Sequence, residues 1–191
     1  QGDSLVIQMP VFESQFRVSF NNKKMTGTWI KRGSVKTQVI PFIAEPGNKR
    51  FTTAANAGKN ISGRWAVFFA SSKKNEQSVG EFKQVGNKLT GTFLNATGDY
   101  RYLEGVVSKD SLFLSGFDGG HAFLFTAKID DNRNISGGTF FSGASYKEGW
   151  SAIKDANAKV PLESVAMYVK PGEESLHFTF KDLEGKKVSI L

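Results

Sequence analysis

The chain has 191 residues, of which 39% are hydrophobic and 17 are Phe, enough apolar material for a sizeable core. It contains no cysteine, which excludes disulfides, thiolate metal sites and a cysteine nucleophile within these residues. The net charge is +7 at pH 7, but the lysines occur as scattered pairs beside predicted turns. Such pairs are typical of solvated loops, so we expect no nucleic-acid partner.

The first predicted elements are β-strands. Gln15–Phe20 and Lys24–Ile30 are predicted to form a hairpin, and Val35–Ile43 adds a third strand. No stretch before residue 160 has the 3.6-residue apolar periodicity of a helix. The sequence therefore predicts an all-β fold.

Eight further strands follow in meander order, separated by turn residues such as Gly86-Asn87 and Lys109-Asp110. Closely spaced turns of this kind indicate antiparallel hairpins. The predicted strands are 63–70, 78–85, 88–94, 99–108, 111–117, 121–129, 134–142 and 149–155. A meander this long must protect its edge strands, and closure into a lipocalin-like, up-and-down barrel does so directly. A two-sheet β-sandwich is the alternative.

A short apolar–Ser/Thr–Gly motif recurs in these strands, for example at Leu89-Thr90-Gly91 and Ile135-Ser136-Gly137. Glycine inside a strand usually marks a bulge or a close approach by another backbone. The irregular spacing of the motif argues against a solenoid repeat. The predicted inward-facing residues are Trp65, Phe82, Leu89, Phe93, Leu103, Leu114, Phe123 and Phe125.

His121 is the most suggestive polar residue, in the segment Asp118-Gly119-Gly120-His121. With Asp118 and Asp99 it could form an acid–base or metal cluster. It could also simply be hydrogen-bonded to the carboxylate of the turn. We favour the second interpretation because a zinc site commonly needs three or four well-spaced ligands. We predict no catalytic residue, no metal ligand and no cofactor in this chain.

The segment Asp99-Tyr100-Arg101-Tyr102-Leu103-Glu104 alternates polar and apolar residues. These side chains could line a pocket, or they could form cross-strand pairs on the outer face of a sheet, which is the favoured interpretation. The candidate ligand-binding residues are His121, Asp118, Asp99, Arg101, Tyr100 and Tyr102.

A change in composition follows the predicted barrel. Residues 158–177 contain Pro161 and Pro171 and are predicted to be a connector, which gives a barrel domain over residues 1–157. Beyond the connector, the turn residues Asp182 to Gly185 separate two alternating apolar segments. They predict a hairpin over residues 178–191.

This last hairpin resembles the first hairpin of thioredoxin-superfamily proteins, in the branch of TlpA-like disulfide reductases and AhpC/TSA peroxiredoxins. There, an aromatic-x-aromatic strand leads through Asp-Leu-x-Gly-Lys into Val-Ser-Leu. Upstream segments such as Lys88–Leu94 and Phe117–Phe125 are similar to the all-β domain that precedes the thioredoxin domain in envelope-anchored TlpA-like proteins. The similarity covers most of residues 10–160. In that family the Cys-x-x-Cys lies some tens of residues past the hairpin, so the resemblance implies that this chain is a fragment of a thiol–disulfide oxidoreductase.

The resemblance implies a non-catalytic accessory domain that positions, or selects partners for, its own C-terminal thioredoxin-like domain. It also implies a location in the bacterial cell envelope, periplasmic or lipoprotein-anchored. Envelope redox proteins are then possible partners, and membrane contact would pass only through an anchor outside this chain. The alternative function is a lipocalin-like barrel that holds a small lipophilic or glycan ligand. The many phenylalanines favour a filled interior, however, because their rings occupy the space that a ligand needs.

Overall fold

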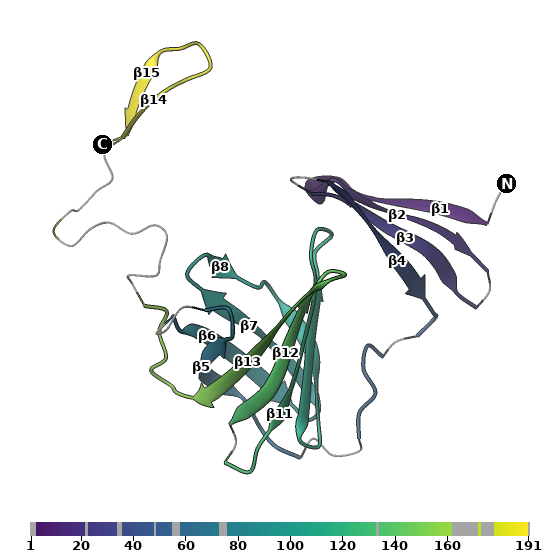
Figure 1. The fold of residues 1–191 in the computed structure, drawn as a ribbon, viewed down its shortest axis with the longest axis vertical. Helices are drawn as coiled ribbons and strands as arrows, with labels where there is room; N and C mark the ends of the chain where they lie inside the picture. The colour runs from purple at the N-terminus through teal and green to yellow at the C-terminus, as the bar shows by residue number, and fades with distance from the viewer. Residues whose placement is uncertain are drawn as a thin grey trace.

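The computed structural model describes residues 3–21, 23–33, 36–47, 49–54, 58–72, 76–132, 134–161, 172 and 178–190. These residues form three separate antiparallel β-sheets (Figure 1). The predicted all-β class is therefore confirmed, and the largest sheet is a closed barrel. Residues 162–171 and 173–177 of the predicted connector lie outside the described residues.

The N-terminal sheet has four strands in sequence order. Its elements are β1 (Ser4–Met9), the 3-10 turn η1 (Pro10–Phe12), β2 (Ser14–Phe20), β3 (Met25–Arg32) and β4 (Thr37–Ala44). The last three strands match the predicted ones, whereas β1 was not predicted. Its apolar residues Leu5, Val6 and Ile7 are consecutive, so the alternation of a half-buried strand is hidden in the sequence.

The barrel is an up-and-down meander of eight strands, with β8 as a short addition. Its elements are β5 (Gly63–Phe69), β6 (Ser78–Val85), β7 (Lys88–Asn95), β8 (Gly98–Asp99), β9 (Leu103–Ser108), β10 (Ser111–Phe117), β11 (Ala122–Ile129), β12 (Ile135–Ser142) and β13 (Tyr146–Lys154). Pairing of β13 with β5 closes it, for example at Trp150 opposite Phe69. The predicted meander is confirmed, and the sandwich alternative is wrong because this pairing joins the first and last strands.

The barrel is shorter than the predicted domain over residues 1–157. It spans Gly63 to Lys154, while the strands between Ser4 and Ala44 form a sheet of their own. The physical reason is that β5 is paired on both edges, with β6 and with β13. No barrel edge is left for β4 to join.

Aromatic rings fill the barrel interior. Phe93 is fully buried, and its ring centroid lies 4.4 Å from that of Phe125 and 5.2 Å from that of Trp150. Phe125 in turn stacks on Phe140 at 4.3 Å. Of the predicted inward set, all residues are buried except Phe123, which is partly buried against the same cluster. Rings at these separations leave no room between them for a ligand.

The recurrent glycines allow this close packing. A Cβ atom at Gly138 would lie 2.5 Å from the carbonyl oxygen of Trp150 and 2.6 Å from its indole nitrogen. Gly138 lies opposite Trp150 in the β12–β13 register, so the ring folds over the glycine. The prediction that the glycines of the Ser/Thr–Gly motif mark close approaches is confirmed at Gly91, where a Cβ atom would lie 2.7 Å from the Phe82 ring, but not at Gly137, which has open space around it.

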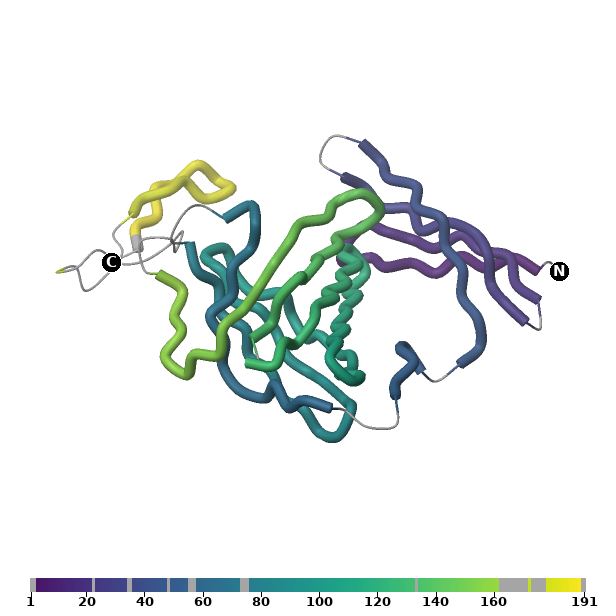
Figure 2. Tube along the Cα trace, turned by 60° about the horizontal axis from the view of Figure 1, so that its bottom comes forward, coloured from purple at the N-terminus to yellow at the C-terminus, as the bar shows by residue number. Residues whose placement is uncertain are grey.

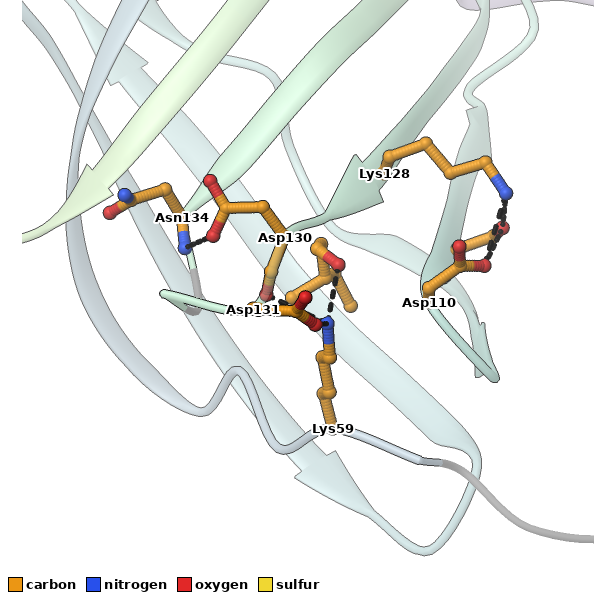
Figure 3. Close-up of polar contacts among 8 residues, drawn as sticks. Lys59, Asp110, Lys128, Asp130, Asp131 and Asn134 are labelled. Carbon is orange, nitrogen blue, oxygen red and sulfur yellow. Dashed lines mark hydrogen bonds and ion pairs between the residues drawn. The ribbon is translucent and has the colours of Figure 1, made fainter.

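One end of the barrel is closed by the segment that precedes β5. The Nζ of Lys59 donates hydrogen bonds to the carbonyl oxygens of Ile129 and Asp130, at 2.9 and 2.8 Å, and to the carboxylate of Asp131 (Figure 3). Ile61 and Trp65 behind it are fully buried, and the Trp65 indole N–H donates to the Ile61 carbonyl oxygen. Lys59 thus fastens residues 58–62 across this end.

The N-terminal sheet packs against the other end of the barrel, as Figures 1 and 2 show. Phe117, the last residue of β10, lies 5.7 Å from the ring of Phe16 and 5.3 Å from that of Trp29. The Ser14 hydroxyl donates to the carbonyl oxygen of Gly119 and accepts a hydrogen bond from the Trp29 indole. One barrel loop is therefore part of the apolar core of the N-terminal sheet.

The C-terminal hairpin consists of β14 (Phe178–Lys181) and β15 (Lys187–Ile190). Its two strands pair with each other and with no other described strand. The predicted hairpin is confirmed except at Leu191, which lies outside the described residues. The predicted connector is packed at its start, since Ala158 is buried against Ala66 and Val79 on the outside of the barrel.

Replacing Phe93 with Ala should lower the free energy of unfolding by ~3–5 kcal/mol, because it removes a ring that several others contact. Phe68→Ala is the matched control, since Phe68 lies on β5 and its side chain is exposed. We expect that control to lose about 1 kcal/mol or less. Urea unfolding measures both, and equal losses for the two variants would contradict the assigned inside and outside faces.

Truncation after Pro161 should leave the melting temperature within a few degrees of the full chain, because the described hairpin shares no strand pairing with the barrel. Truncation after Lys154 removes Ala158, whose carbonyl oxygen accepts a hydrogen bond from Arg64. We expect that loss to lower the melting temperature by about 4 °C, equivalent to ~1–2 kcal/mol. A collapse of the fold on the first truncation would show that the barrel depends on residues after 161.

Candidate functional site

The end of the barrel opposite Lys59 carries all six candidate residues. The connections β5–β6, β7–β9, β10–β11 and β12–β13 meet at this end, because alternate turns of a meander lie at the same end of a barrel. Asp99 to Tyr102 lie in the second connection, and Asp118 and His121 lie in the third. We call this the open end.

The predicted strand over residues 99–108 is interrupted at this point. Arg101 has a φ of +57°, a left-handed conformation that is uncommon for residues other than glycine. The carboxylate of Asp99 accepts a hydrogen bond from the Arg101 backbone N–H at 2.8 Å and holds the turn. The favoured interpretation as cross-strand pairs is therefore wrong for Tyr100, Arg101 and Tyr102, which lie between β8 and β9. It holds for Asp99, which pairs with Leu94, and for Glu104, which forms an ion pair with Lys88 on the neighbouring strand β7.

Asp118 contacts two of the other candidates, Arg101 and His121. Its Oδ1 accepts hydrogen bonds from the backbone N–H groups of Gly120 and His121, at 2.9 and 2.7 Å. Its Oδ2 lies 3.0 Å from Nδ1 of His121 and 3.1 Å from Nε of Arg101. The interpretation of His121 as a histidine bonded to a turn carboxylate is confirmed.

These contacts fix the ionisation of Asp118. Burial opposes the charged form, but the hydrogen bonds from the His121 ring and from the backbone N–H groups of Gly120 and His121 outweigh it, so the pKa of Asp118 is lowered. A carboxylate held in this way is a poor general base, since its lone pairs are already in use. Asp118 therefore positions Arg101 and His121.

A residue of the N-terminal sheet completes this cluster. The ring of Phe12 meets the His121 ring edge-on at 6.1 Å, and the Arg101 guanidinium lies 6.0 Å from the Phe12 centroid. His121 also stacks on Phe123 at 5.4 Å. Sequence reasoning missed Phe12, and no local signal could have found it because the contact joins two separate sheets.

Tyr100 lies at the centre of the open end. Its ring contacts Phe93, Phe123, Phe125 and Phe140 at centroid distances between 5.3 and 6.1 Å, so it covers the interior rings. Burial raises the pKa of Tyr100, and the nearby Glu148 carboxylate raises it further. Its hydroxyl therefore stays protonated at neutral pH.

Three pockets open around these residues. One of about 440 Å³ includes Asp99, Arg101, Asp118 and His121. Another, of about 320 Å³, includes Tyr102 together with Arg101, Asp118 and His121. A third, of about 200 Å³, is lined by Tyr100 and by residues that the sequence did not single out. Those additional residues are Phe69, Ser71, Ser72, Glu76, Ser78, Asn95, Ala96, Thr97 and Glu148.

The described residues do not bring together a metal-binding group of three or more His, Cys, Asp or Glu side chains. Asp99 in particular does not join Asp118 and His121 in such a group. Within the described part of the chain, no helix is long and apolar enough to cross a membrane.

Comparisons with protein-family models, curated proteins and solved structures found no match to this chain. The resemblance to TlpA-like proteins thus rests on the residues quoted above, and its functional content remains a proposal. A function for the open end therefore has to be inferred from the side chains that line it.

Replacing Asp118 with Asn should destabilise the protein by about 1–3 kcal/mol at pH 7, because hydrogen bonds to a charged acceptor are lost. The folded-state pKa of Asp118 is lowered, whereas an unfolded aspartate titrates near ~3.9. The stabilisation is therefore fully present above that value and is lost as the pH falls through the folded pKa. The difference between wild type and variant should shrink below about pH 4.

Urea unfolding at pH 7, 5 and 3 measures this difference. Glu45→Gln removes one carboxylate charge from an exposed residue and is the control for a general charge effect. A difference for Asp118→Asn that stayed constant down to pH 2 would contradict the assigned role of its charge.

Proposed function

We propose that residues 3–161 form a non-catalytic accessory module that positions, or selects partners for, a thioredoxin-like domain to which the hairpin β14–β15 belongs. The observation that carries this proposal is the state of the hairpin. It forms as the sequence predicts, yet it leaves the side chains of Phe178, Phe180 and Val188 exposed.

The hairpin has one strongly apolar face. Phe180 lies opposite Val188, and Phe178 lies two residues along the same strand, so the three side chains share a face. Their exposed fractions are 45%, 36% and 50%. An isolated two-stranded hairpin is marginally stable in water. A larger sheet or a helix packed on this face would bury the rings, as the first hairpin of a thioredoxin-like domain requires.

The barrel and the N-terminal sheet support a non-catalytic role. The barrel interior is filled by rings such as Phe93 and Phe125. At the open end, the carboxylate of Asp118 is committed to Arg101 and His121. At this end the hydroxyls of Ser71 and Tyr146 both donate hydrogen bonds to the Glu148 carboxylate, and none of the described hydrogen bonds joins a histidine to them to complete a catalytic set.

The envelope location and the redox partners in this proposal rest on the family resemblance. The filled interior gives no support to the alternative of a lipocalin-like carrier with its ligand inside the barrel. A ligand could be held only outside the ring cluster.

The coding sequence gives the first test. A Cys-x-x-Cys is expected within about one domain length, roughly 100–150 codons, after Leu191. A stop codon directly after Leu191 would remove the basis of the proposal.

The second part of the test uses the longer protein that the proposal expects. Deleting residues 3–161 should leave its reduction of insulin disulfides within about twofold, because the thiolate that attacks lies in the other domain. A loss greater than about tenfold (~1.4 kcal/mol) in a variant that still folds would make the β module part of the catalytic unit.

A further inference from the structure

The open end contains a recess that the accessory role does not explain. The pockets of about 440 and 200 Å³ share the lining residues Tyr100, Asn95 and Thr97. They therefore adjoin and form one recess. At the opposite end of the barrel, Lys59 and Ile61 close the interior without leaving a recess. Closing a barrel end therefore does not require a recess like the one at the open end.

Ser78 is an unusual part of this recess. It lies two residues before Gly80 and four before the core residue Phe82, so it shares their inward face. The residue is only 4% exposed and lines the smaller pocket. None of the described residues hydrogen-bonds to its hydroxyl, and that oxygen is not sealed from the pocket. Polar groups this deeply buried normally have a partner, so the hydroxyl is available to a ligand.

Hydrogen-bond donors and hydrogen-bond acceptors surround Ser78. Oε2 of Glu148 accepts hydrogen bonds from the backbone N–H and the hydroxyl of Ser71, at 3.1 and 2.5 Å. Oε1 of Glu148 accepts one from the Tyr146 hydroxyl at 3.0 Å and has a further lone pair open. The protonated Tyr100 hydroxyl adds a donor beside them.

The charges of the recess disfavour an anionic ligand. Arg101 is paired with Asp118, while Asp99, Glu76 and Glu148 add further carboxylates to the lining. The recess therefore offers hydroxyl, amide and carboxylate groups that can hydrogen-bond to the hydroxyl groups of an uncharged ligand. This composition is too polar for an acyl chain.

Aromatic faces border the same recess. His121 and Phe123 stack nearly parallel, with an interplanar angle of 24°, and Tyr100 meets Phe123 edge-on. A sugar ring combines hydroxyl groups around its edge with apolar C–H faces, and both kinds of surface have counterparts here.

We propose that the open end of the barrel binds a neutral saccharide, which hydrogen-bonds to Ser78, Asn95 and Glu148 and packs a C–H face on the aromatic rings. The site is independent of the hairpin and of any redox chemistry. The saccharide lies above the ring cluster, at the mouth of the barrel.

Titration of the ¹⁵N-labelled full chain with glucose, N-acetylglucosamine and maltose tests the proposal by NMR. At least one sugar should give saturable amide shifts at residues 71, 72, 76–78, 95–100 and 148, with a Kd of about 1 mM or tighter. Ser78→Ala and Tyr100→Phe each remove one hydroxyl, and each should weaken binding by about fivefold. Ser136→Ala is the matched control, because Ser136 is an exposed serine at the closed end of the barrel.

Melting temperatures of all variants show whether a loss of binding reflects a loss of fold. Putrescine and decanoate are titrated in parallel as a cationic and a lipophilic probe. Saturable binding of either one at the recess, with none of the sugars, would overturn the proposal. So would the absence of saturable shifts with every sugar, or sugar binding that Ser78→Ala and Tyr100→Phe leave unchanged.

Discussion

The pairing of β5 with β13 is the interaction on which the rest of the structure depends. It joins residues from the two ends of the meander, such as Trp65 with Lys154 and Phe69 with Trp150. Contacts this far apart in sequence carry a loop-closure cost that local hairpins avoid. Once made, the pairing encloses the rings and removes both sheet edges. It also creates two ends with different chemistry.

The filled interior then decides where any binding chemistry can lie. Stacking of Phe93 on Phe125 and of Phe125 on Phe140 occupies the volume that comparable barrels leave for a ligand. Close packing is possible because glycines such as Gly138 allow a ring to lie directly over the neighbouring backbone. Polar groups are thereby displaced to the ends, where loops are free to vary without disturbing the ring cluster.

The two ends are not equivalent. At one end, hydrogen bonds from Lys59 hold residues 58–62 across the barrel, with Ile61 and Trp65 buried behind Lys59. At the other end, the β10–β11 loop has two roles. Phe117 and Gly119 hold the N-terminal sheet, while Asp118 and His121 border the recess around Tyr100. The position of the N-terminal sheet is therefore coupled to the shape of the open end, through this loop and through the contact of Arg101 with Phe12.

The sequence by itself determined the all-β class, the meander order and the strand positions except β1 and residues 100–102, because alternation, turn residues and repeated Ser/Thr-Gly steps are local signals. It also indicated the Asp118–His121 contact, which spans only three residues. Only the tertiary structure decided that residues 4–44 form a separate sheet, since that depends on β13 occupying the free edge of β5. The recess at the open end was likewise decided only by the tertiary structure. Ser78, Asn95 and Glu148 lie on three different strands, and nothing in their local sequence marks them until closure of the barrel brings them to one end.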